Sequence, residues 1–427
     1  MNTKPLDFKY YLVGGAVRDK LLKLDVKDRD WVVVGETITA MQNRGFSPVG
    51  KTFPVFLHPD TKEEYALARK ETKTGEGYNG FDCIADPTIS LEEDLLRRDL
   101  TINAIAENSD GTYIDPFNGL ADLDNKLLRH VSLAFTEDPL RVLRVARFHA
   151  RFYALGFSVA TETLALMQTI SLQGELKTLS AERIWQETEK ALLTENPEQF
   201  FLTLKACGAL EILFPEIYNL YGIPQRAEHH PEIDCGIHTM LSLEQAVKLT
   251  SDLSHNEKVI VRFATLTHDL GKAITPSAVL PSHRGHEQAG IPLVNHFCKR
   301  LKTPKQVQTL ALLNCEFHLL AHTAAQLKPA TVLKLLKRLD AFRKPEQLTY
   351  FLLCSKADSR GRTGFENRHY LQAHYLLACF EACKNVSVKD INPNKNIQGK
   401  AIGEELDRIK THAIKQCKNK FNFHPYE

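Results

Sequence analysis

The spacing of hydrophobic and polar positions changes along the chain near residue 136. Before this point, short apolar runs alternate with helix-like stretches: residues 11–13 and 31–34 predict strands, and 16–24 predicts a helix with its apolar positions on one face. After it, strand signals nearly cease, and Leu-rich stretches with helical spacing follow, such as 325–339. The pattern predicts an α+β N-terminal region followed by an all-α remainder.

The N-terminal region combines a glycine turn with two carboxylates at the start of a strand. Gly14 and Gly15 follow the first predicted strand, and Asp28 and Asp30 precede the apolar run 31–34. Alternate residues of a strand point to one side, so we expect both carboxylates on one face, a geometry for holding divalent cations. Glycines let a triphosphate approach the backbone, and the N–H groups at the following helix N-terminus favour an anion.

Further charged residues are candidates for the same site. Arg18 lies one turn into the first predicted helix, where it can pair with a phosphate. Glu64, in a predicted strand at 64–69, is either a third metal carboxylate or, as we favour, a surface residue. A stripe of arginines, which is also typical of a solvated helix face, follows the acidic start of a predicted helix: Arg141, Arg144 and Arg147.

These motifs in combination resemble the polymerase-β-like nucleotidyltransferases, and in particular the class II tRNA nucleotidyltransferases, the CCA-adding enzymes. The stretch 91–106, predicted to be an interrupted helix, contains RRDLTINA, which matches the RRDxTINA motif of that family. The resemblance places Arg98 on the nucleotide. The segment 137–141, EDPLR, matches the base-recognition motif EDxxR, and the resemblance implies that Arg144 and Arg147 meet the triphosphate.

The EDxxR motif supplies Asp138 and Arg141, a pair with a plain chemical rationale. Cytosine and adenine both present an exocyclic amine beside a ring-nitrogen acceptor, whereas uracil and guanine present a carbonyl beside an N–H. A carboxylate that accepts from the amine and a guanidinium that donates to the ring nitrogen would select C and A and refuse U and G.

The helical half carries a second set of candidate ligands. His268 and Asp269, followed by Leu-Gly-Lys, resemble the HD-domain metal-dependent phosphohydrolases, with His238 matching the first histidine of the pattern and Asp358 its final carboxylate. Imidazole and carboxylate ligands suit a transition metal or magnesium, and a metal-bound water can attack a phosphate ester. Four more histidines have two possible roles at this stage. They are either core or solvated residues, or they contact a substrate phosphate: His283, His286, His318 and His322.

Composition narrows the class of protein. The formal net charge is only +2, so nucleic acid would need a local basic surface. The nine cysteines contain no CxxC pair, which favours reduced thiols in a cytoplasmic protein. The N-terminus lacks a signal-peptide core, and no stretch of 18 apolar residues occurs, so we expect no membrane segment.

The resemblance as a whole is to bacterial class II CCA-adding enzymes that carry an appended HD domain. It implies addition of C, C and A to the tRNA 3′ end from CTP and ATP, with Asp28 and Asp30 holding Mg²⁺. It also implies phosphatase, 2′-nucleotidase and 2′,3′-cyclic phosphodiesterase activity at the HD site with Ni²⁺ or another divalent transition metal, in a monomer or homodimer. The expected order is a nucleotidyltransferase head, a helical neck and body, an HD domain and a helical C-terminal region, at 1–136, 137–234, 235–336 and 337–427.

Two alternatives remain at this stage. A poly(A) polymerase shares the head motifs, but the HD segment and the modest basic tail argue against it. An HD phosphohydrolase with a regulatory nucleotide-binding head is the other, and intact Asp28, Asp30 and Arg98 argue against that reading.

Overall fold

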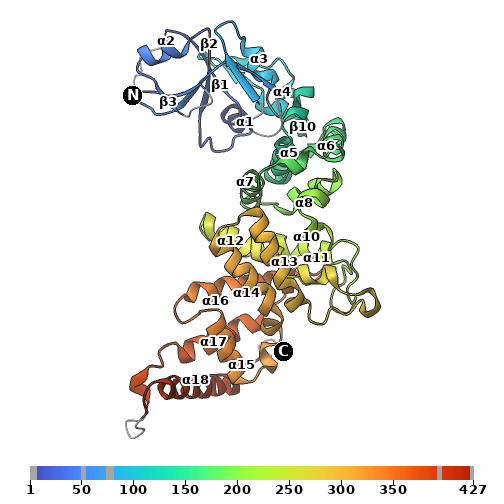
Figure 1. Cartoon of the computed structure of the whole chain (residues 1–427), viewed down its shortest axis with the longest axis vertical. Coiled ribbons are helices and arrows are strands. Elements are labelled where there is room, and N and C mark those ends of the chain that lie inside the picture. The colour runs from blue at the N-terminus through green and yellow to red at the C-terminus, as the bar shows by residue number, and fades with distance from the viewer. Residues whose placement is uncertain (1–6, 50–53, 74–80, 392–396, 424–427) are drawn as a thin grey trace. The chain divides into compact units, whose positions relative to one another are not determined.

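The computed structural model describes residues 7–49, 54–73, 81–391 and 397–423 (Figure 1). The chain divides into two compact units, of which the first comprises residues 1–188 and 199–213 and the second residues 189–198 and 214–427. The predicted change from mixed to helical structure is confirmed, since every strand in the described part of the chain ends before residue 160.

The first unit contains a seven-stranded mixed sheet in the order β3-β4-β5-β2-β1-β8-β9, with a separate hairpin, β6-β7, and a small pair, β10-β11. The predicted strands at 11–13, 31–34 and 64–69 are present, although the last ends early and passes into the hairpin. The strands are β1 (Lys9–Val13), β2 (Asp30–Val34), β3 (Ser47–Val49), β4 (Val55–Leu57), β5 (Glu64–Leu67), β6 (Arg69–Lys73), β7 (Phe81–Ala85), β8 (Ala106–Glu107), β9 (Tyr113–Ile114), β10 (Leu127–Leu128) and β11 (Ser158–Val159).

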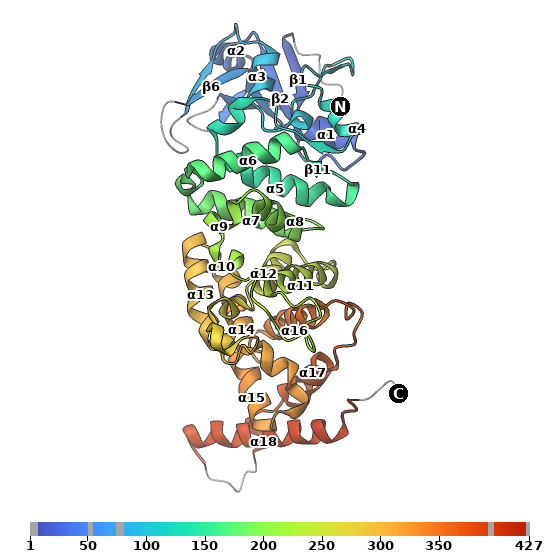
Figure 2. The ribbon, with the colours of Figure 1, turned by 90° about the vertical axis from the view of Figure 1, so that its right-hand side faces the viewer.

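Helices complete the first unit. The interrupted helix predicted at 91–106 is α3 followed by a turn and a short 3₁₀ segment, Thr101–Asn103. Helices α5 and α6 lie below the sheet in Figure 2. The helices are α1 (Gly15–Leu21), α2 (Ile38–Asn43), α3 (Leu91–Leu96), α4 (Gly119–Asp124), α5 (Leu140–Phe152), α6 (Thr161–Gln173), α7 (Ala181–Leu192), α8 (Glu198–Ala206) and α9 (Ala209–Leu213), with α7 and α8 crossing the unit boundary.

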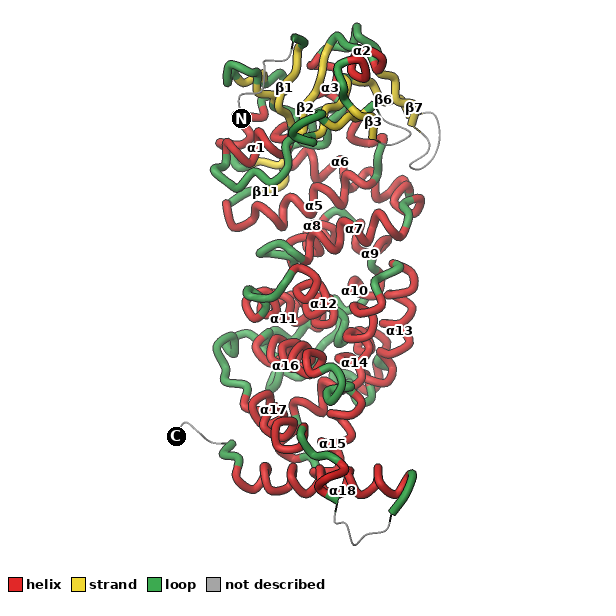
Figure 3. Tube along the Cα trace, turned by 90° about the vertical axis from the view of Figure 1, so that its left-hand side faces the viewer, coloured by secondary structure: helices red, strands yellow, loops and turns green. Residues whose placement is uncertain are grey.

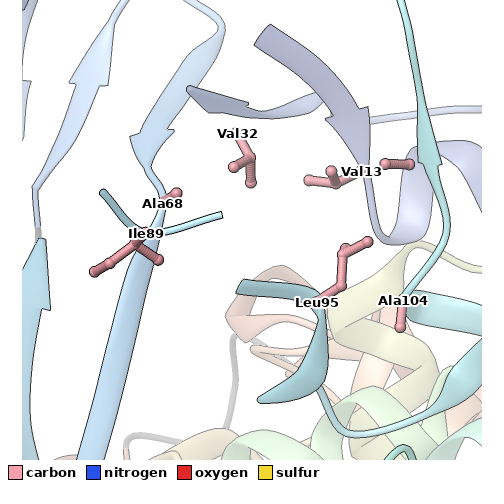
Figure 4. Packing of buried hydrophobic residues seen from close by; sticks show 7 residues of the cluster. Val13, Val32, Ala68, Ile89, Leu95 and Ala104 are labelled. Atoms are coloured by element: carbon pink, nitrogen blue, oxygen red, sulfur yellow. The ribbon is translucent and has the colours of Figure 1, made fainter. Parts of the chain in front are cut away.

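Both faces of β2 are covered, which explains its unbroken apolar run. Val32 belongs to a cluster with Val13, Leu95 and Ala104, which Figure 4 shows packed together. Val33, pointing the other way, belongs to a second cluster that includes Phe56. This packing fixes the register of β2, and with it the position of the carboxylates at its start.

The second unit is helical. Helices α11, α12, α14 and α16 pack against one another, and α18 lies along α15 and α17 (Figure 3). Its helices are α10 (Pro215–Tyr218), α11 (Cys235–Leu249), α12 (His255–Leu266), α13 (His286–Leu301), α14 (Lys305–His322), α15 (Pro329–Arg338), α16 (Pro345–Arg360), α17 (Leu371–Lys384) and α18 (Lys400–Lys420). Among the described residues, we find no helix with the length and apolar character of a membrane span.

Candidate functional site

The glycine turn and the carboxylates of the first unit lie side by side. Val13, the last residue of β1, is the register partner of Asp30, the first residue of β2, so Gly14 follows directly beside Asp30. The groups around Asp30 displace water from its carboxylate and so raise its pKa, although the residue is exposed; the charge of Arg98 lowers this pKa and that of Asp28 raises it. The predicted carboxylates and the predicted nucleotide-binding arginine therefore share one electrostatic environment.

The sequence left the role of Glu64 undecided between a metal ligand and a surface residue. Glu64 is exposed, as expected of a surface residue, and it is also the register partner of Asp30 on the neighbouring parallel strand β5. Residues in register on adjacent strands present their side chains on the same face. Asp30 and Glu64 thus lie side by side at one end of the sheet, and Asp28 is close enough for its charge to raise the pKa of Asp30.

Arg98 lies against the glycine turn. Gly14 has a φ of 71°, and a Cβ atom there would stand 2.8 Å from Nη1 of Arg98, so only glycine fits without displacing the guanidinium. Nη1 donates to the Asn103 carbonyl at 3.3 Å and Nη2 to Asp94 at 3.2 Å, while the buried Nε has no hydrogen-bond partner in the described part of the chain. Sequence reasoning missed Asp94, whose spacing of four residues before Arg98 is the signal for this pair.

Arg18 is enclosed rather than open to solvent. Its guanidinium donates to Asp19 at 2.9 Å and to the side chain of Asn103 at 2.5 Å, and it lies about 5 Å from the rings of Phe148 and Phe152 on α5. Burial lowers the pKa of Arg18, an effect that Asp19 opposes. Arg18 therefore joins α1 to α5 beside Gly15, and its contact with a phosphate stays a prediction.

The two residues of the predicted base-reading pair have other partners in this structure. Asp138 accepts from the Leu140 amide at 3.1 Å and from Arg183 at 2.9 Å. Arg141, largely buried, donates to the Ala134 carbonyl at 2.7 Å and to the Arg97 carbonyl at 2.6 Å. The second of these bonds ties the EDxxR segment to the RRDxTINA segment. Base reading stays a prediction, and it requires these bonds to be exchanged for a nucleotide.

The arginine stripe of α5 is not a simple solvated face. Arg144 pairs with the buried Asp99 at 2.7 Å, and Arg147 pairs with Glu187 of α7 at 2.5 Å. Although burial raises the pKa of Asp99, the charge of Arg144 and a hydrogen bond from Asn103 outweigh it and hold the carboxylate ionised. The stripe thus fixes α5 to the RRDxTINA segment and to α7, and its contacts with a triphosphate stay predictions.

The four predicted HD residues come together in the second unit. His238 on α11, His268 and Asp269 at the end of α12, and Asp358 on α16 are all at least 96% buried, since their exposed fractions are 0%, 1%, 1% and 4%. Nε2 of His238 lies 3.1 Å from Asp358, and Nε2 of His268 lies 3.1 Å from Asp269. Ligand atoms of His238, His268 and Asp358 lie within 4.8 Å of one another, close enough to hold one ion.

A second ligand group shares Asp269 with the first. Asp269, His286 and His318 also bring their ligand atoms within 4.8 Å of one another. The Nδ1 atoms of His286 and His318 both lie at hydrogen-bond distance from backbone carbonyls, so each donates there and its Nε2 carries the lone pair. These two Nε2 atoms lie 3.2 Å apart beside Asp269, an arrangement that a metal ion would satisfy. Burial lowers the pKa of His318 to about 3.

Other polar atoms support a metal in this cluster. Nε2 of His268 and Oδ1 of Asp269 are buried and make no hydrogen bond of suitable geometry with the described residues, although Nε2 lies 3.1 Å from Oδ2 of Asp269. Nδ1 of His268 donates to the Thr265 carbonyl at 2.7 Å. Lys272, 2.6 Å from both Asp269 and Gln225, compensates part of the buried negative charge. We call this set the HD ligand cluster: His238, His268, Asp269, His286, His318 and Asp358.

The remaining two candidate histidines fall outside both groups. His283 contacts Thr275 at 2.7 Å and the Pro224 carbonyl at 3.0 Å, which indicates a structural role. His322 lies 2.6 Å from Asp358 through Nε2 and 3.0 Å from the hydroxyl of Tyr370 through Nδ1, so it orients a ligand carboxylate.

Family comparisons divide the chain in the same order. Residues 10–129 match the family described as the Poly A polymerase head domain, residues 156–220 match a probable RNA- and SrmB-binding site of polymerase A, and residues 236–342 match the HD domain. Among solved structures, a Thermotoga maritima CCA-adding enzyme complexed with tRNA is 20% identical, with a TM-score of 0.62, over 97% of this chain and 88% of that one. A CCA-adding enzyme complexed with CTP is 21% identical, with a TM-score of 0.61, over 97% of this chain and 88% of that one. These likenesses show the fold.

Relatives at higher identity extend over almost the full length of both chains. The multifunctional CCA protein of Pasteurella multocida is 56% identical over 96% of this chain and 97% of its own, and that of Haemophilus influenzae is 54% identical over 97% and 99%. The protein is therefore an enzyme, and it belongs to the family of the multifunctional CCA proteins.

Proposed function

We propose that the first unit adds C, C and A in turn to the 3′ end of tRNA, using CTP and ATP and releasing pyrophosphate. The observation that carries this proposal is the convergence of Asp28, Asp30 and Arg98 on the turn at Gly14. Relatives named multifunctional CCA proteins, and structures of CCA-adding enzymes with tRNA, CTP or ATP, support it.

Asp28 and Asp30 are the residues that would hold magnesium. The bound ions supply Lewis-acid stabilisation of charge that develops on the transferring phosphoryl group. Arg98, oriented by Asp94, donates to a phosphate oxygen, and Gly14 and its neighbour leave the backbone open to the same phosphates. These residues bind and align the nucleotide, while the 3′-hydroxyl of the tRNA is the nucleophile.

Asp138 and Arg141 select the base in this proposal. When CTP or ATP enters, Asp138 exchanges Arg183 for the exocyclic amine, and Arg141 exchanges a backbone carbonyl for the ring nitrogen. Arg144 and Arg147, held by acidic partners along α5, contact the triphosphate. No template strand is needed, because the protein itself reads the base.

The direct test uses purified protein and tRNA that lacks its 3′-terminal CCA. Each labelled nucleotide is supplied separately and then in combination, with the products sequenced. We expect CTP to extend the tRNA by C and C, ATP to add A only afterwards, and neither UTP nor GTP to be used. A long run of adenosines would instead indicate a poly(A) polymerase.

For the second unit we propose metal-dependent hydrolysis of phosphomonoesters, including 2′-nucleotides, and of 2′,3′-cyclic phosphates. The pair of ligand groups that share Asp269 supports it, since nickel or another divalent transition metal bound there would activate a water molecule. Metal analysis of the purified protein, compared with a His318→Ala variant, tests the second group. We expect the variant to lose one ion per chain, and an unchanged metal content contradicts the assignment.

We also propose limits for the domains. We assign a head, a neck and body, an HD domain and a C-terminal region to residues 1–136, 137–234, 235–336 and 337–427. The C-terminal region contributes Asp358 to the HD ligand cluster, so the HD site is complete only when α16 is included. A cytoplasmic location and a monomeric or homodimeric state complete the proposal.

A further inference from the structure

The second unit contains a pocket that neither candidate site explains. It lies between α16 and the start of α17, two helices that contact each other (Figure 3), and its volume is about 190 Å³. Four basic side chains line it, together with leucines, an alanine and the ring of Tyr370, and no carboxylate occurs among the described lining residues. The basic side chains are Lys356, Arg360, His369 and His374.

The pocket is distinct from the HD ligand cluster. Its α16 residues, from Thr349 through Lys356 to Arg360, recur every three or four positions and form one face of the helix. Asp358 is nine residues after Thr349, which at 3.6 residues per turn places it about 180° around the helix. Its contacts are accordingly with His238 and His322. The basic side chains of the pocket therefore belong to a different face of α16 from the metal ligand, and Tyr370 links the two, since its ring lines the pocket and its hydroxyl lies 3.0 Å from His322.

Lys356 and Arg360 have no carboxylate partner among the described residues. The half-buried ammonium of Lys356 has no hydrogen bond or ion pair within the described ranges. Burial lowers the pKa of Lys356, and the like charge of Arg360 lowers it further. Arg360 donates its Nε to the Arg368 carbonyl at 3.0 Å, which fixes the guanidinium. Like charges four residues apart destabilise a helix by about 0.2–0.5 kcal/mol, and an anion between them removes that cost.

We propose that this pocket binds a small phosphomonoester. Its phosphate lies between Lys356 and Arg360, with the exposed imidazoles of His369 and His374 as further donors. The rest of the ligand contacts the apolar wall. The volume of about 190 Å³ is below the roughly 300–1,000 Å³ typical of drug-sized ligands, so the occupant is the size of a sugar phosphate rather than a nucleotide.

Calorimetric titration of the full-length protein tests the proposal. The protein is treated with a chelator, so that metal in the HD ligand cluster cannot capture phosphate, and is titrated with ribose 5-phosphate, inorganic phosphate and ribose. We expect ribose 5-phosphate to bind, inorganic phosphate to bind more weakly and ribose not to bind. The double variant Lys356→Gln, Arg360→Gln should lower the affinity for ribose 5-phosphate by at least about tenfold, because it removes two charge-assisted interactions.

Two further variants make the outcome specific. Lys299→Gln removes an exposed positive charge on α13, away from the pocket, and should leave the affinity unchanged. Ala373→Leu narrows the pocket without removing a charge. It should lower the affinity for ribose 5-phosphate more than the affinity for inorganic phosphate. Equal affinity in wild type and double variant overturns the proposal, as does equal weakening by Lys299→Gln. If ribose 5-phosphate fails to bind while the double variant weakens an oligoribonucleotide, the surface contacts an RNA backbone and the proposal is wrong.

Discussion

The carboxylates at the start of β2 carry the strongest prediction for a single residue. Asp28→Asn or Asp30→Asn should reduce CCA addition on the order of a thousandfold or more, because a bound metal contributes several kcal/mol of charge stabilisation in the transition state. Both side chains are exposed, so packing is not lost and thermal unfolding should be unchanged. Single-turnover addition on tRNA lacking CCA measures the effect. Wild-type rates in either variant would remove that carboxylate from the metal site.

Base choice is a second prediction about single residues. Asp138→Ala or Arg141→Ala should relax the preference for CTP and ATP over UTP and GTP by about 1–3 kcal/mol, the range for a bidentate base contact. Competition between nucleotides in one reaction measures the preference. Arg183→Gln is the matched control: it removes the present partner of Asp138 and should leave the preference intact. A loss of rate without any loss of preference in the first two variants would count against the assignment.

Residues whose chemistry is encoded locally were predictable, and residues that depend on distant partners were not. Asp28 and Asp30 are two positions apart, at the entry to one strand, and His268 and Asp269 are adjacent, so pattern alone indicates them. Arg183 meets Asp138 across 45 residues. His286 and His318 meet across 32 residues, and no local spacing signals that contact.

At the scale of elements, strands β1 and β2 were predictable because each is mainly an apolar run, residues 10–13 and 31–34, and because Val32 and Val33 are buried on opposite faces of β2. The segment 91–106 was harder. Its N-terminus has a capping box between Ser90 and Glu93, as a helix should. The helix ends after Leu96, where the chain makes contacts with α5: the Arg97 carbonyl accepts from Arg141, and Asp99 pairs with Arg144. Tertiary pairing here overrides helix propensity.

Helix α12 allows a stability prediction of its own. Arg262 is 1% exposed, and it donates to the carbonyls of Leu192 and Thr194 and to the Thr250 hydroxyl at 2.6–3.0 Å. Arg262→Met keeps the apolar stem but leaves buried acceptors unpaired, each at a cost of about 1–3 kcal/mol. We expect the free energy of unfolding to fall by about 2–5 kcal/mol in urea denaturation of the full chain.

A partly exposed arginine of the same unit provides the control for α12. Arg300 pairs with Glu216 at 2.7 Å, and its side chain is 30% exposed. Arg300→Met should cost no more than about 1 kcal/mol, since ion pairs in contact with solvent contribute little. If the two variants were equally stable, the buried bonds of Arg262 would not be a determinant of the fold.

At the scale of the whole molecule, the chain carries two sets of chemistry in two compact units. The carboxylates, the glycine turn and the arginines of the proposed transferase site all belong to the first unit, and the HD ligand cluster belongs to the second. The sequence indicated this division because the strand pattern stops before the first HD ligand appears. It did not indicate the pocket beside α16, since that surface arises from the packing of two helices.

This division predicts that the two activities can be separated. His268→Ala with Asp269→Ala removes ligands from both metal groups, so phosphatase and cyclic phosphodiesterase activity should fall to background with magnesium, nickel or manganese. CCA addition by the same preparation should stay within about twofold of wild type, because the changed residues and the transferase residues belong to different compact units and share no ligand. His283→Ala is the matched control, since that histidine bonds Thr275 and the Pro224 carbonyl and belongs to neither ligand group. This variant should retain hydrolysis.

Hydrolysis that survived the double change with every metal would refute the metal assignment. Simultaneous loss of CCA addition in a variant with wild-type circular dichroism would show that the two units do not act independently.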